Sequence, residues 1–270
     1  MANEHEAEAF MALADKIARE RGFGAPSYKG SCLKRRIAVR MRARGAADYD
    51  AYARLLDQDP AEFDKLIDAL TINVTKLYRN AEAWDAVRDQ VLPELWALDT
   101  PRLRCWVAGC SSGEEAYTLA ALWHACITAK GDASRLGRLR IVATDIDRAS
   151  LEAAAAGQYP AEAFAELPAA LRERYFADAR KASAELRALL HFQKHDMLRE
   201  SPPLGPFHLI TCRNVIIYFD RASQEALMRR FHEALAPGGL LVLGKVETLL
   251  GASRALFEAV DQRQRIFRRI

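Results

Sequence analysis

The feature that most constrains the fold is a repeated alternation of short apolar runs with longer helical patterns in residues 102–270. The apolar runs are five or six residues long: Leu103–Ala108, Leu139–Thr144, Phe207–Cys212 and Leu240–Gly244. Helical patterns lie between them, at residues 114–129, 149–156 and 221–236. Short apolar strands that alternate with helices are typical of a mainly parallel sheet covered on both faces. The sequence therefore predicts an α/β domain over residues 102–270.

Two segments depart from this alternation. Residues 160–195 are too long for a simple connection and carry their own helical pattern at 168–176, so we expect a small inserted subdomain there. The last eight residues, Arg263–Ile270, alternate apolar and polar side chains. That pattern predicts a final edge strand whose arginines point outward.

The amino-terminal part of the chain has a different character. Residues 6–70 show only helical patterns, separated by turn signals at glycine and proline, and this predicts a small all-helical domain over residues 1–80. A further helical stretch leads to Pro101, and proline disfavours helix in the residue before it. We therefore expect a linker helix at 81–101.

Composition narrows the classes of protein to which the chain can belong. Its 270 residues allow one large domain or two modest ones, and 50% hydrophobic with 28% charged residues lies in the globular range. The five cysteines form no CxxC pair and the six histidines show no HExxH spacing, so we expect neither disulfides nor a metal site. The amino end is acidic and no run of about 18 apolar residues occurs, so we expect a cytoplasmic protein without membrane insertion.

Basic residues are concentrated near the amino end. Between Ser27 and Arg44 there are seven basic residues and no acidic one. Arg36, Arg40 and Arg44 recur at four-residue spacing, which places them on one face of a helix, and an apolar set at the same spacing forms a second face. We expect the apolar face to pack and the basic face to point outward. Such a face binds a negatively charged partner or is an ordinary solvated surface, and both interpretations stay open.

Chemistry-bearing residues follow the first predicted strand. In an open parallel sheet, ligands bind beyond the carboxyl ends of the strands. The turn there contains Gly109 and Gly113, and glycine permits close approach of the backbone to a bound molecule. No Gly-Lys-Ser/Thr follows, so the turn is not a P-loop, and the adjacent Glu114 and Glu115 would repel a phosphate. The turn suits a cationic ligand.

The second predicted strand is followed by Asp145. An acidic side chain at this position can accept hydrogen bonds from both hydroxyls of a ribose. Because aspartate is also common before helices, a helix-capping role for Asp145 is equally open. A nucleoside that carries positive charge fits both the acidic turn and Asp145, and S-adenosylmethionine joins an adenosine to a sulfonium.

A family resemblance rests on five motifs that occur in order along the chain: Val107-Ala-Gly-Cys-Ser-Ser-Gly-Glu-Glu-Ala-Tyr-Thr118, Ala143-Thr-Asp-Ile-Asp147, Gly157-Gln-Tyr159, Cys212-Arg-Asn-Val-Ile-Ile-Tyr-Phe-Asp220 and Pro237-Gly-Gly239 with Glu247. From about Tyr28 to Phe267, the chain resembles the chemotaxis receptor methyltransferases, the CheR family. The resemblance implies an α/β fold in which a small all-helical receptor-facing domain precedes a Rossmann-like methyltransferase domain with a small inserted subdomain.

The resemblance also implies the reaction. Members of the family transfer a methyl group from S-adenosylmethionine to glutamate side chains of a chemoreceptor and release S-adenosylhomocysteine. The implied partner is the cytoplasmic helical domain of a methyl-accepting receptor, bound through the basic helix Lys34–Arg44. The oligomeric state stays open.

Cofactor-binding residues are carried over from the family motifs one by one. They are the two turn glycines and the polar residues around the implied site: Asn73, Thr75, Arg79, Gly109, Gly113, Glu115, Asp145, Asp196 and Asn214. Glu115 would contact the methionine ammonium, and Asp145 would contact the ribose. Asp196 and Asn214 would contact the adenine or nearby backbone.

The implied catalytic residues are Arg79, Arg213 and Tyr218. Arg79 would hold the substrate carboxylate or the carboxylate of the cofactor by charge-assisted hydrogen bonds. Arg213 and Tyr218 would line the face across which the methyl group moves, although the aromatic side chain of Tyr218 would also suit a plain core position.

Three functions remain open. The first is an active protein-glutamate O-methyltransferase. The second is a catalytically weak homologue that binds the cofactor to regulate a signalling array, which Val74 favours because it stands where the family usually has Glu. The third is a nucleic-acid methyltransferase, suggested by the basic helix. The chain lacks an aromatic platform beside that helix and any Asn/Asp-Pro-Pro-Tyr/Phe motif, so we expect no nucleic-acid partner.

In some members of the family the inserted subdomain binds a short carboxyl-terminal peptide of the receptor. The corresponding loop here, Ala177–Ala184, is short and has no glycine, so it cannot easily adopt the positive-φ turn that would open an extra strand edge. We therefore expect receptor recognition without such a peptide.

Overall fold

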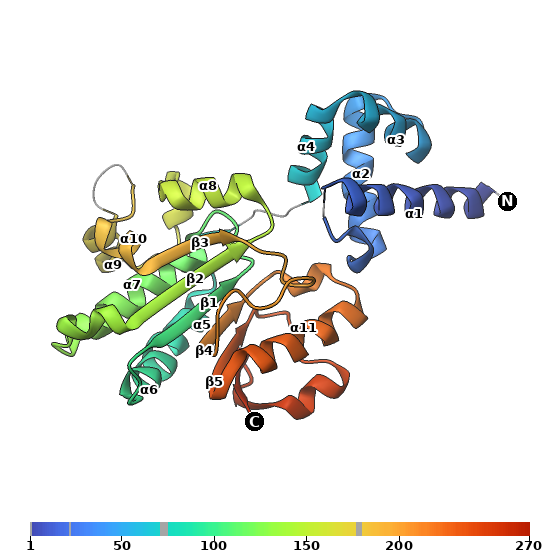
Figure 1. Ribbon diagram of the computed structural model, residues 1–270. Coiled ribbons are helices and arrows are strands. Elements are labelled where there is room, and N and C mark those ends of the chain that lie inside the picture. Colours follow the sequence, from blue (N-terminus) through green and yellow to red (C-terminus); the bar gives the residue numbers. More distant parts are fainter. Residues whose placement is uncertain (1, 22, 71–74, 177–179) are drawn as a thin grey trace. The chain divides into compact units, whose positions relative to one another are not determined.

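The structure is a computed structural model that describes residues 2–21, 23–70, 75–176 and 180–270 (Figure 1). The chain divides into two compact units. The first contains residues 1–72 and the segment Tyr218–Ser223, and the second contains residues 73–217 and 224–270. No helix within the described ranges is long and apolar enough to span a membrane.

The first unit is all-helical in its described residues before Tyr218, apart from connecting turns. Its elements are α1 (Ala2–Arg21), η1 (Ala25–Ser27), α2 (Gly30–Arg44), α3 (Tyr49–Gln58) and α4 (Pro60–Leu70). Asp48 caps α3 by accepting a hydrogen bond from the backbone of Ala51 at 2.7 Å. Gly45 ends α2 with a φ of +67°, a conformation that glycine adopts without strain. Local capping signals therefore mark where α3 begins and where α2 ends.

The basic stripe of α2 faces α4 within this unit, and the expectation that it points outward is wrong. Arg40 donates to both carboxylate oxygens of Glu62 on α4, at 2.9 and 2.6 Å, and Arg44 donates to the same carboxylate at 3.1 Å. Glu62 is fully buried and also accepts from the hydroxyl of Tyr52 at 2.7 Å. Arg36 donates to a backbone carbonyl near the end of α4 at 2.5 Å. Residue spacing shows which side chains share a helix face, but it does not show what packs against that face.

The second unit is built on a sheet that has seven strands in the described residues, in the order β3-β2-β1-β4-β5-β7-β6. Figure 1 labels the first five strands of this order. The strands are β1 (Leu103–Ala108), β2 (Leu139–Asp145), β3 (Leu190–Lys194), β4 (Phe207–Cys212), β5 (Leu235–Leu243), β6 (Phe257–Asp261) and β7 (Ile266–Arg269). The pairs among β1 to β5 are parallel, whereas β7 is antiparallel to both β5 and β6. The four apolar runs of the sequence form the neighbouring strands β2, β1, β4 and β5, so the predicted α/β fold is confirmed.

The carboxyl-terminal strand is present, but the expectation that it forms an edge is wrong. β7 lies between β5 and β6, and β6 forms the edge. In β7, Ile266 and Phe267 are buried and the following arginines are half-buried, and the residue pattern of this segment does not reveal that another strand pairs with it. The sequence pattern does not predict β6, because Phe257 is the only buried residue of this strand.

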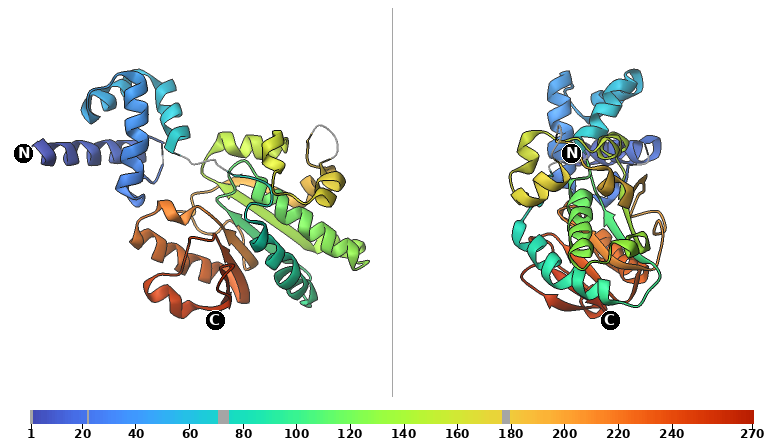
Figure 2. Two further views of the ribbon diagram at one scale, coloured as in Figure 1. Left: turned by 180° about the vertical axis from the view of Figure 1, so that it is seen from behind. Right: turned by 90° about the vertical axis from the view of Figure 1, so that its left-hand side faces the viewer.

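Helices cover both faces of the sheet (Figures 1 and 2). α7 (Glu114–Ala129) packs on one face and α11 (Arg221–Ala234) on the other. Adjacent residues of β1 show this arrangement, because alternate side chains of a strand point to opposite faces. Val107 joins the main core with side chains of α7, whereas Trp106 contacts Phe231 of α11 with 5.4 Å between ring centroids.

Residues 81–97, expected to belong to a linker helix, form a helical run that packs in the second unit. The run consists of α5 (Ala81–Ala86), η2 (Val87–Val91) and α6 (Leu92–Ala97). Trp84, Val87 and Trp96 are buried in the same core as β1 and α7. These apolar side chains make the segment part of the α/β unit.

The remaining helical elements are short: η3 (Ala133–Arg138), α8 (Arg148–Ala156), η4 (Ala161–Phe164), α9 (Ala169–Tyr175), α10 (Ala184–Leu189), η5 (Ile216–Tyr218) and η6 (Gly251–Leu256). The inserted segment contains η4, α9 and α10, and its last residues form β3, which pairs with β2. The loop on which the expectation of peptide-independent recognition rests includes residues 177–179, which lie outside the described ranges. That expectation stays a prediction.

Candidate functional site

The turn after β1 depends on two glycines. Gly109 has a φ of +76° and Gly113 a φ of +93°. A Cβ at Gly109 would lie 2.7 Å from Cγ2 of Val215, and a Cβ at Gly113 would lie 2.8 Å from Cβ of Ala154. Both backbone conformation and space therefore require glycine here.

Asp145 lies beside this turn at the end of β2. One carboxylate oxygen accepts from the backbone N–H of Ser111 at 2.7 Å, and the other accepts from that of Asp147 at 3.0 Å. The cap of α8 is Asp147, which accepts from the backbone of Ala149 at 3.0 Å. Asp145 is therefore not the helix cap that the sequence left open. Burial raises the pKa of Asp145, and its backbone hydrogen bonds oppose that shift.

A buried ion pair joins the first turn of α7 to the residue after β4. Nη1 of Arg213 lies 3.4 Å from Oε2 of Glu115, and the other oxygen of Glu115 accepts from the hydroxyl of Thr211 at 2.7 Å. Burial raises the pKa of Glu115, whereas the positive charges of Arg213 and Arg79 and the hydrogen bond from Thr211 oppose the rise. The pair places a carboxylate and a guanidinium beyond the carboxyl ends of β1 and β4, where the charge of Arg79 also acts on Glu115.

Arg213 also holds the turn that precedes α5. Its Nη2 donates to the backbone carbonyl of Arg79 at 2.8 Å, and its guanidinium lies 4.8 Å from the ring centroid of Trp84. The backbone N–H of Tyr78 donates to the hydroxyl of Thr118 on α7 at 2.9 Å. These contacts place the backbone of Arg79 next to the side chain of Arg213 and close to α7.

Asn214 occupies the turn after β4 with a φ of +62°, which is uncommon for a residue other than glycine. Its backbone N–H donates to Oε2 of Glu247 at 3.0 Å, and Glu247 is 2% exposed. Sequence reasoning found Asn214 but gave Glu247 no role, because its hydrogen-bond donors are backbone groups on another strand end.

Asp196 follows β3. Its Oδ1 accepts from the backbone N–H of Leu198 at 2.9 Å, and Nε of Arg199 lies 3.8 Å from its Oδ2. Oδ2 is buried and has no hydrogen-bond partner among the described residues. Buried carboxylate oxygens normally accept hydrogen bonds, so this atom fits an external donor such as an adenine amino group.

Comparisons with known proteins give the same assignment to both units. Residues 73–266 match the model described as the SAM-binding domain of CheR methyltransferase, and residues 8–71 match the all-alpha domain of CheR methyltransferase. The chain belongs to the CheR methyltransferase family. The resemblance inferred from the sequence motifs is confirmed, and S-adenosylmethionine is the cofactor of this family's α/β domain.

Among its relatives, the chain is 33% identical over 237 residues to a chemotaxis protein methyltransferase of Listeria monocytogenes. The aligned region covers 87% of this chain and 87% of the relative. It is 34% identical over 260 residues to a chemotaxis protein methyltransferase of Klebsiella aerogenes, and the aligned region covers 92% of this chain and 86% of the relative. It is also 36% identical over 245 residues to an uncharacterized 104.1 kDa protein from the hypE 3′ region of Rhodobacter capsulatus, covering 89% of this chain. The match spans only 25% of that larger relative.

The residues of this CheR-family chain fit S-adenosylmethionine. The sulfonium and ammonium groups of the cofactor are cationic, and Glu115, Asp145 and Asp196 supply carboxylates beyond the ends of three strands. Oδ2 of Asp196, which accepts no hydrogen bond from the described residues, can accept one from the ligand. When bound, the cofactor supplies an activated methyl group.

The described structure does not test three of the residues that the family implies for this site. Asn73 lies outside the described residues, as does Val74. Thr75 is half-buried at the start of the segment that leads to Arg79. Tyr218 belongs to the first unit, where its carbonyl accepts from the backbone of Lys29 at 2.8 Å. Their roles stay predictions.

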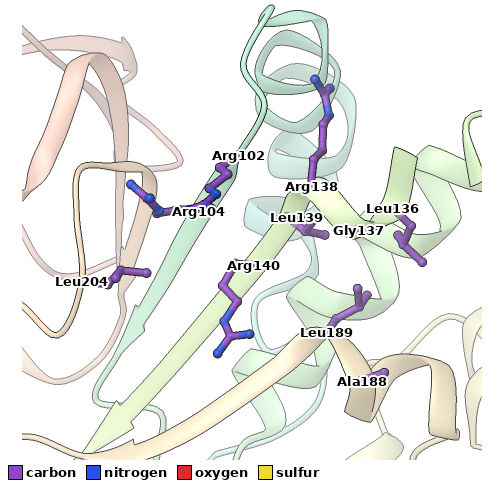
Figure 3. A pocket seen from close by; sticks show the side chains of 10 residues that line it. All are labelled: Arg102, Arg104, Leu136, Gly137, Arg138, Leu139, Arg140, Ala188, Leu189 and Leu204. Atoms are coloured by element: carbon purple, nitrogen blue, oxygen red, sulfur yellow. The ribbon is translucent and has the colours of Figure 1, made fainter. Parts of the chain in front are cut away.

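A hollow of about 610 Å³ lies at the other end of the strands, around the amino ends of β1 and β2 (Figure 3). Its lining includes Arg104, Arg138 and Arg140, whose side chains point in different directions (Figure 3). Arg138 is already engaged by the backbone carbonyls of Trp96 and Leu98. Because the arginines do not converge on one point, we assign the reaction to the carboxyl ends of the strands, where open α/β sheets bind ligands.

Proposed function

We propose that this protein transfers the methyl group of S-adenosylmethionine to glutamate side chains of a chemoreceptor, giving glutamyl methyl esters and S-adenosylhomocysteine. The observation that carries the proposal is the grouping of Glu115, Arg213 and Arg79 beyond the strand ends of a CheR SAM-binding domain. The grouping offers a carboxylate for the cofactor's cation and a guanidinium for the substrate's anion.

The reaction does not require a protein side chain to act as a general acid, a general base or a nucleophile. A glutamate carboxylate is ionised at neutral pH. Bound S-adenosylmethionine would supply an activated methyl group to one carboxylate oxygen, with S-adenosylhomocysteine as the neutral leaving group. No proton has to move. The protein therefore contributes alignment and exclusion of water, and alignment alone can supply about 7–11 kcal/mol in favourable cases.

Arg79 and Arg213 take different roles in this proposal. The side chain of Arg213 is 2% exposed and engaged with Glu115 and the backbone of Arg79, so it holds the site together. Arg79 is half-buried and its charge acts on both members of the ion pair. We therefore assign the substrate carboxylate to Arg79. Tyr218 would complete the face across which the methyl group moves.

The receptor-binding surface in this proposal is the outward face of α2 rather than its inward arginine stripe. Arg35, Val39 and Arg42 are exposed, with Val39 at 49%, and their spacing of four and three residues places them on one helix face. A cationic face around an apolar side chain suits the acidic cytoplasmic helices of a methyl-accepting receptor.

A cofactor-binding regulatory module without turnover is the competing function. The sequence observation that favours it is Val74, which replaces the Glu usual in the family. The discriminating experiment incubates the protein with methyl-labelled S-adenosylmethionine and membranes that contain candidate receptors. Base-labile label on receptor protein supports methyl transfer, whereas tight cofactor binding without transfer to any receptor supports the regulatory module.

A further inference from the structure

Glu247 has a buried carboxylate that is held by backbone groups. Its Oε2 accepts from the backbone N–H groups of Asn214 at 3.0 Å and Gly244 at 2.5 Å. Its Oε1 accepts from those of Val215 at 2.9 Å and Ile216 at 3.0 Å. A single carboxylate thus binds four backbone donors, three from the turn after β4 and one from the turn after β5.

This arrangement connects the two strand ends that border the cofactor site. The backbone N–H of Glu247 donates to the carbonyl of Gly244 at 2.9 Å, which closes the turn after β5 around the carboxylate. A Cβ at Gly244 would lie 2.7 Å from both the backbone nitrogen of Asn214 and Oε2 of Glu247. The close approach therefore requires glycine at 244. We call the Glu247 carboxylate and its four backbone donors the clamp, and the short distances at Gly244 leave no room for the clamp to shift.

The clamp also explains how Asn214 keeps its unusual backbone. A φ of +62° costs free energy for a residue with a side chain and persists only when the surroundings impose it. The donors at Asn214, Val215 and Ile216 are consecutive, so one carboxylate fixes the whole turn immediately after Arg213. Charge-assisted hydrogen bonds of this kind are shorter and stronger than neutral ones.

We propose that Glu247 is a positioning residue, which holds Arg213 and Asn214 in the orientation that cofactor binding needs. It acts through the backbone of the turn after β4 and does not itself touch the cofactor. The inference rests on the proposed function insofar as Arg213 and Asn214 belong to the cofactor site.

The nature of the four donors makes the charge itself necessary. A glutamine at 247 has the same shape, but its NH₂ group would face two N–H donors, which leaves the Asn214 and Gly244 donors or the Val215 and Ile216 donors without an acceptor. Buried donors that lose their acceptor destabilise the conformation that buries them. Glu247→Gln should therefore release the turn without removing side-chain volume.

The test measures S-adenosylhomocysteine binding by calorimetry at 15 °C, where each variant is checked to be folded by circular dichroism. We expect Glu247→Gln to weaken binding at least tenfold. Gly244→Ala perturbs the same clamp while keeping the carboxylate, and we expect it to weaken binding in the same direction. It also provides the test if the glutamine variant does not fold.

Glu62→Gln is the matched control, because Glu62 is also a buried glutamate that accepts several hydrogen bonds, but it lies in the first unit. It should lower the melting temperature yet keep the affinity for S-adenosylhomocysteine within twofold of the wild type. The inference is overturned if both clamp variants bind within twofold of the wild type, or if Glu62→Gln weakens binding as much as Glu247→Gln. Absence of receptor methylation by the wild type would contradict the proposed function and leave this binding comparison unaffected.

Discussion

Nη1 of Arg213 lies 3.4 Å from Oε2 of Glu115, and both side chains are largely buried where β4 and α7 meet the turn before α5. A buried carboxylate is costly unless it is paired and hydrogen-bonded. Here the hydroxyl of Thr211 and the guanidinium of Arg213 provide both. The pair is therefore charge-balanced, and we propose that Glu115 accepts a further hydrogen bond from the cationic cofactor.

Glu115→Gln is expected to weaken S-adenosylmethionine binding by about 1.5–3 kcal/mol, because a charge-assisted hydrogen bond to the methionine ammonium is lost. Calorimetry measures this change. Glu114→Gln is the matched control, since Glu114 is its buried neighbour and bonds to the hydroxyl of Ser112 at 2.8 Å. Equal affinities of the Glu115 variant and the wild type would show that Glu115 does not contact the cofactor.

Asp145→Ala should weaken S-adenosylhomocysteine binding by about 1–3 kcal/mol through loss of hydrogen bonds to the ribose. Asp145 also accepts from the backbone of Ser111, so the variant could loosen the glycine turn instead. A cycle with an analogue that lacks both ribose hydroxyls separates these effects. We expect the variant and the wild type to bind the analogue equally, and an equal loss for both ligands would rule out a ribose contact.

For Arg79→Ala and Tyr218→Phe we expect a larger loss of turnover than of cofactor affinity, since both residues are assigned to the transfer geometry. Steady-state kinetics with receptor membranes and calorimetry with S-adenosylhomocysteine measure the two quantities. Turnover equal to that of the wild type in both variants would end this assignment.

Part of the candidate cofactor site could be predicted from the sequence, because one rule of parallel sheets places ligands beyond the strand ends. Once the strands ending at Ala108 and Asp145 were identified, Gly109, Gly113 and Asp145 followed. Family motifs added Glu115 and Arg213, but the contact between them depends on how α7 packs beside β4, which the sequence does not contain.

The errors have a common physical cause. The spacing of Arg36, Arg40 and Arg44 correctly describes one helix face, yet Arg40 and Arg44 on that face pair with Glu62, which lies on another helix. Glu247 was part of a family motif, but its role could not be predicted for the same reason, because its partners are backbone N–H groups that carry no sequence signal. Patterns along the chain predict elements and faces, whereas partners across elements need the structure.

Arg35→Glu and Arg42→Glu should slow receptor methylation at low salt and leave S-adenosylhomocysteine affinity unchanged. The expected reason is weaker electrostatic attraction to an acidic receptor, so the difference from the wild type should shrink as salt rises. Arg54→Glu on α3 is a control for reversal of an exposed charge elsewhere in the first unit. Wild-type methylation rates in both α2 variants at low salt would show that this face is only solvated.

The Glu62 cluster should make the first unit sensitive to acid. Burial disfavours the ionised form of Glu62, but the hydrogen bonds from Arg40, Tyr52 and Arg44 outweigh burial and lower its pKa below the usual 4.5. The stabilisation is therefore complete above about pH 4.5 and is lost as pH falls through the lowered value.

Chemical denaturation between pH 7 and pH 3 measures this loss. We expect Glu62→Gln to lower the free energy of unfolding by about 3–5 kcal/mol at pH 7, because Arg40 is left without its buried partner. The variant should also show a smaller further loss below pH 4.5 than the wild type. Identical pH profiles of the two proteins would contradict the role given to this carboxylate.

Methyl-ester formation on a receptor tests the account most directly. The protein is incubated with S-adenosylmethionine labelled in its methyl group and with membranes that contain one candidate receptor at a time, and the recovered receptor is then treated with mild alkali. The account predicts labelled receptor whose label is released as methanol, together with no labelling when the methyl-accepting glutamates are replaced by alanine. Alkali-stable label, or no label on any receptor while S-adenosylhomocysteine binds tightly, would contradict it.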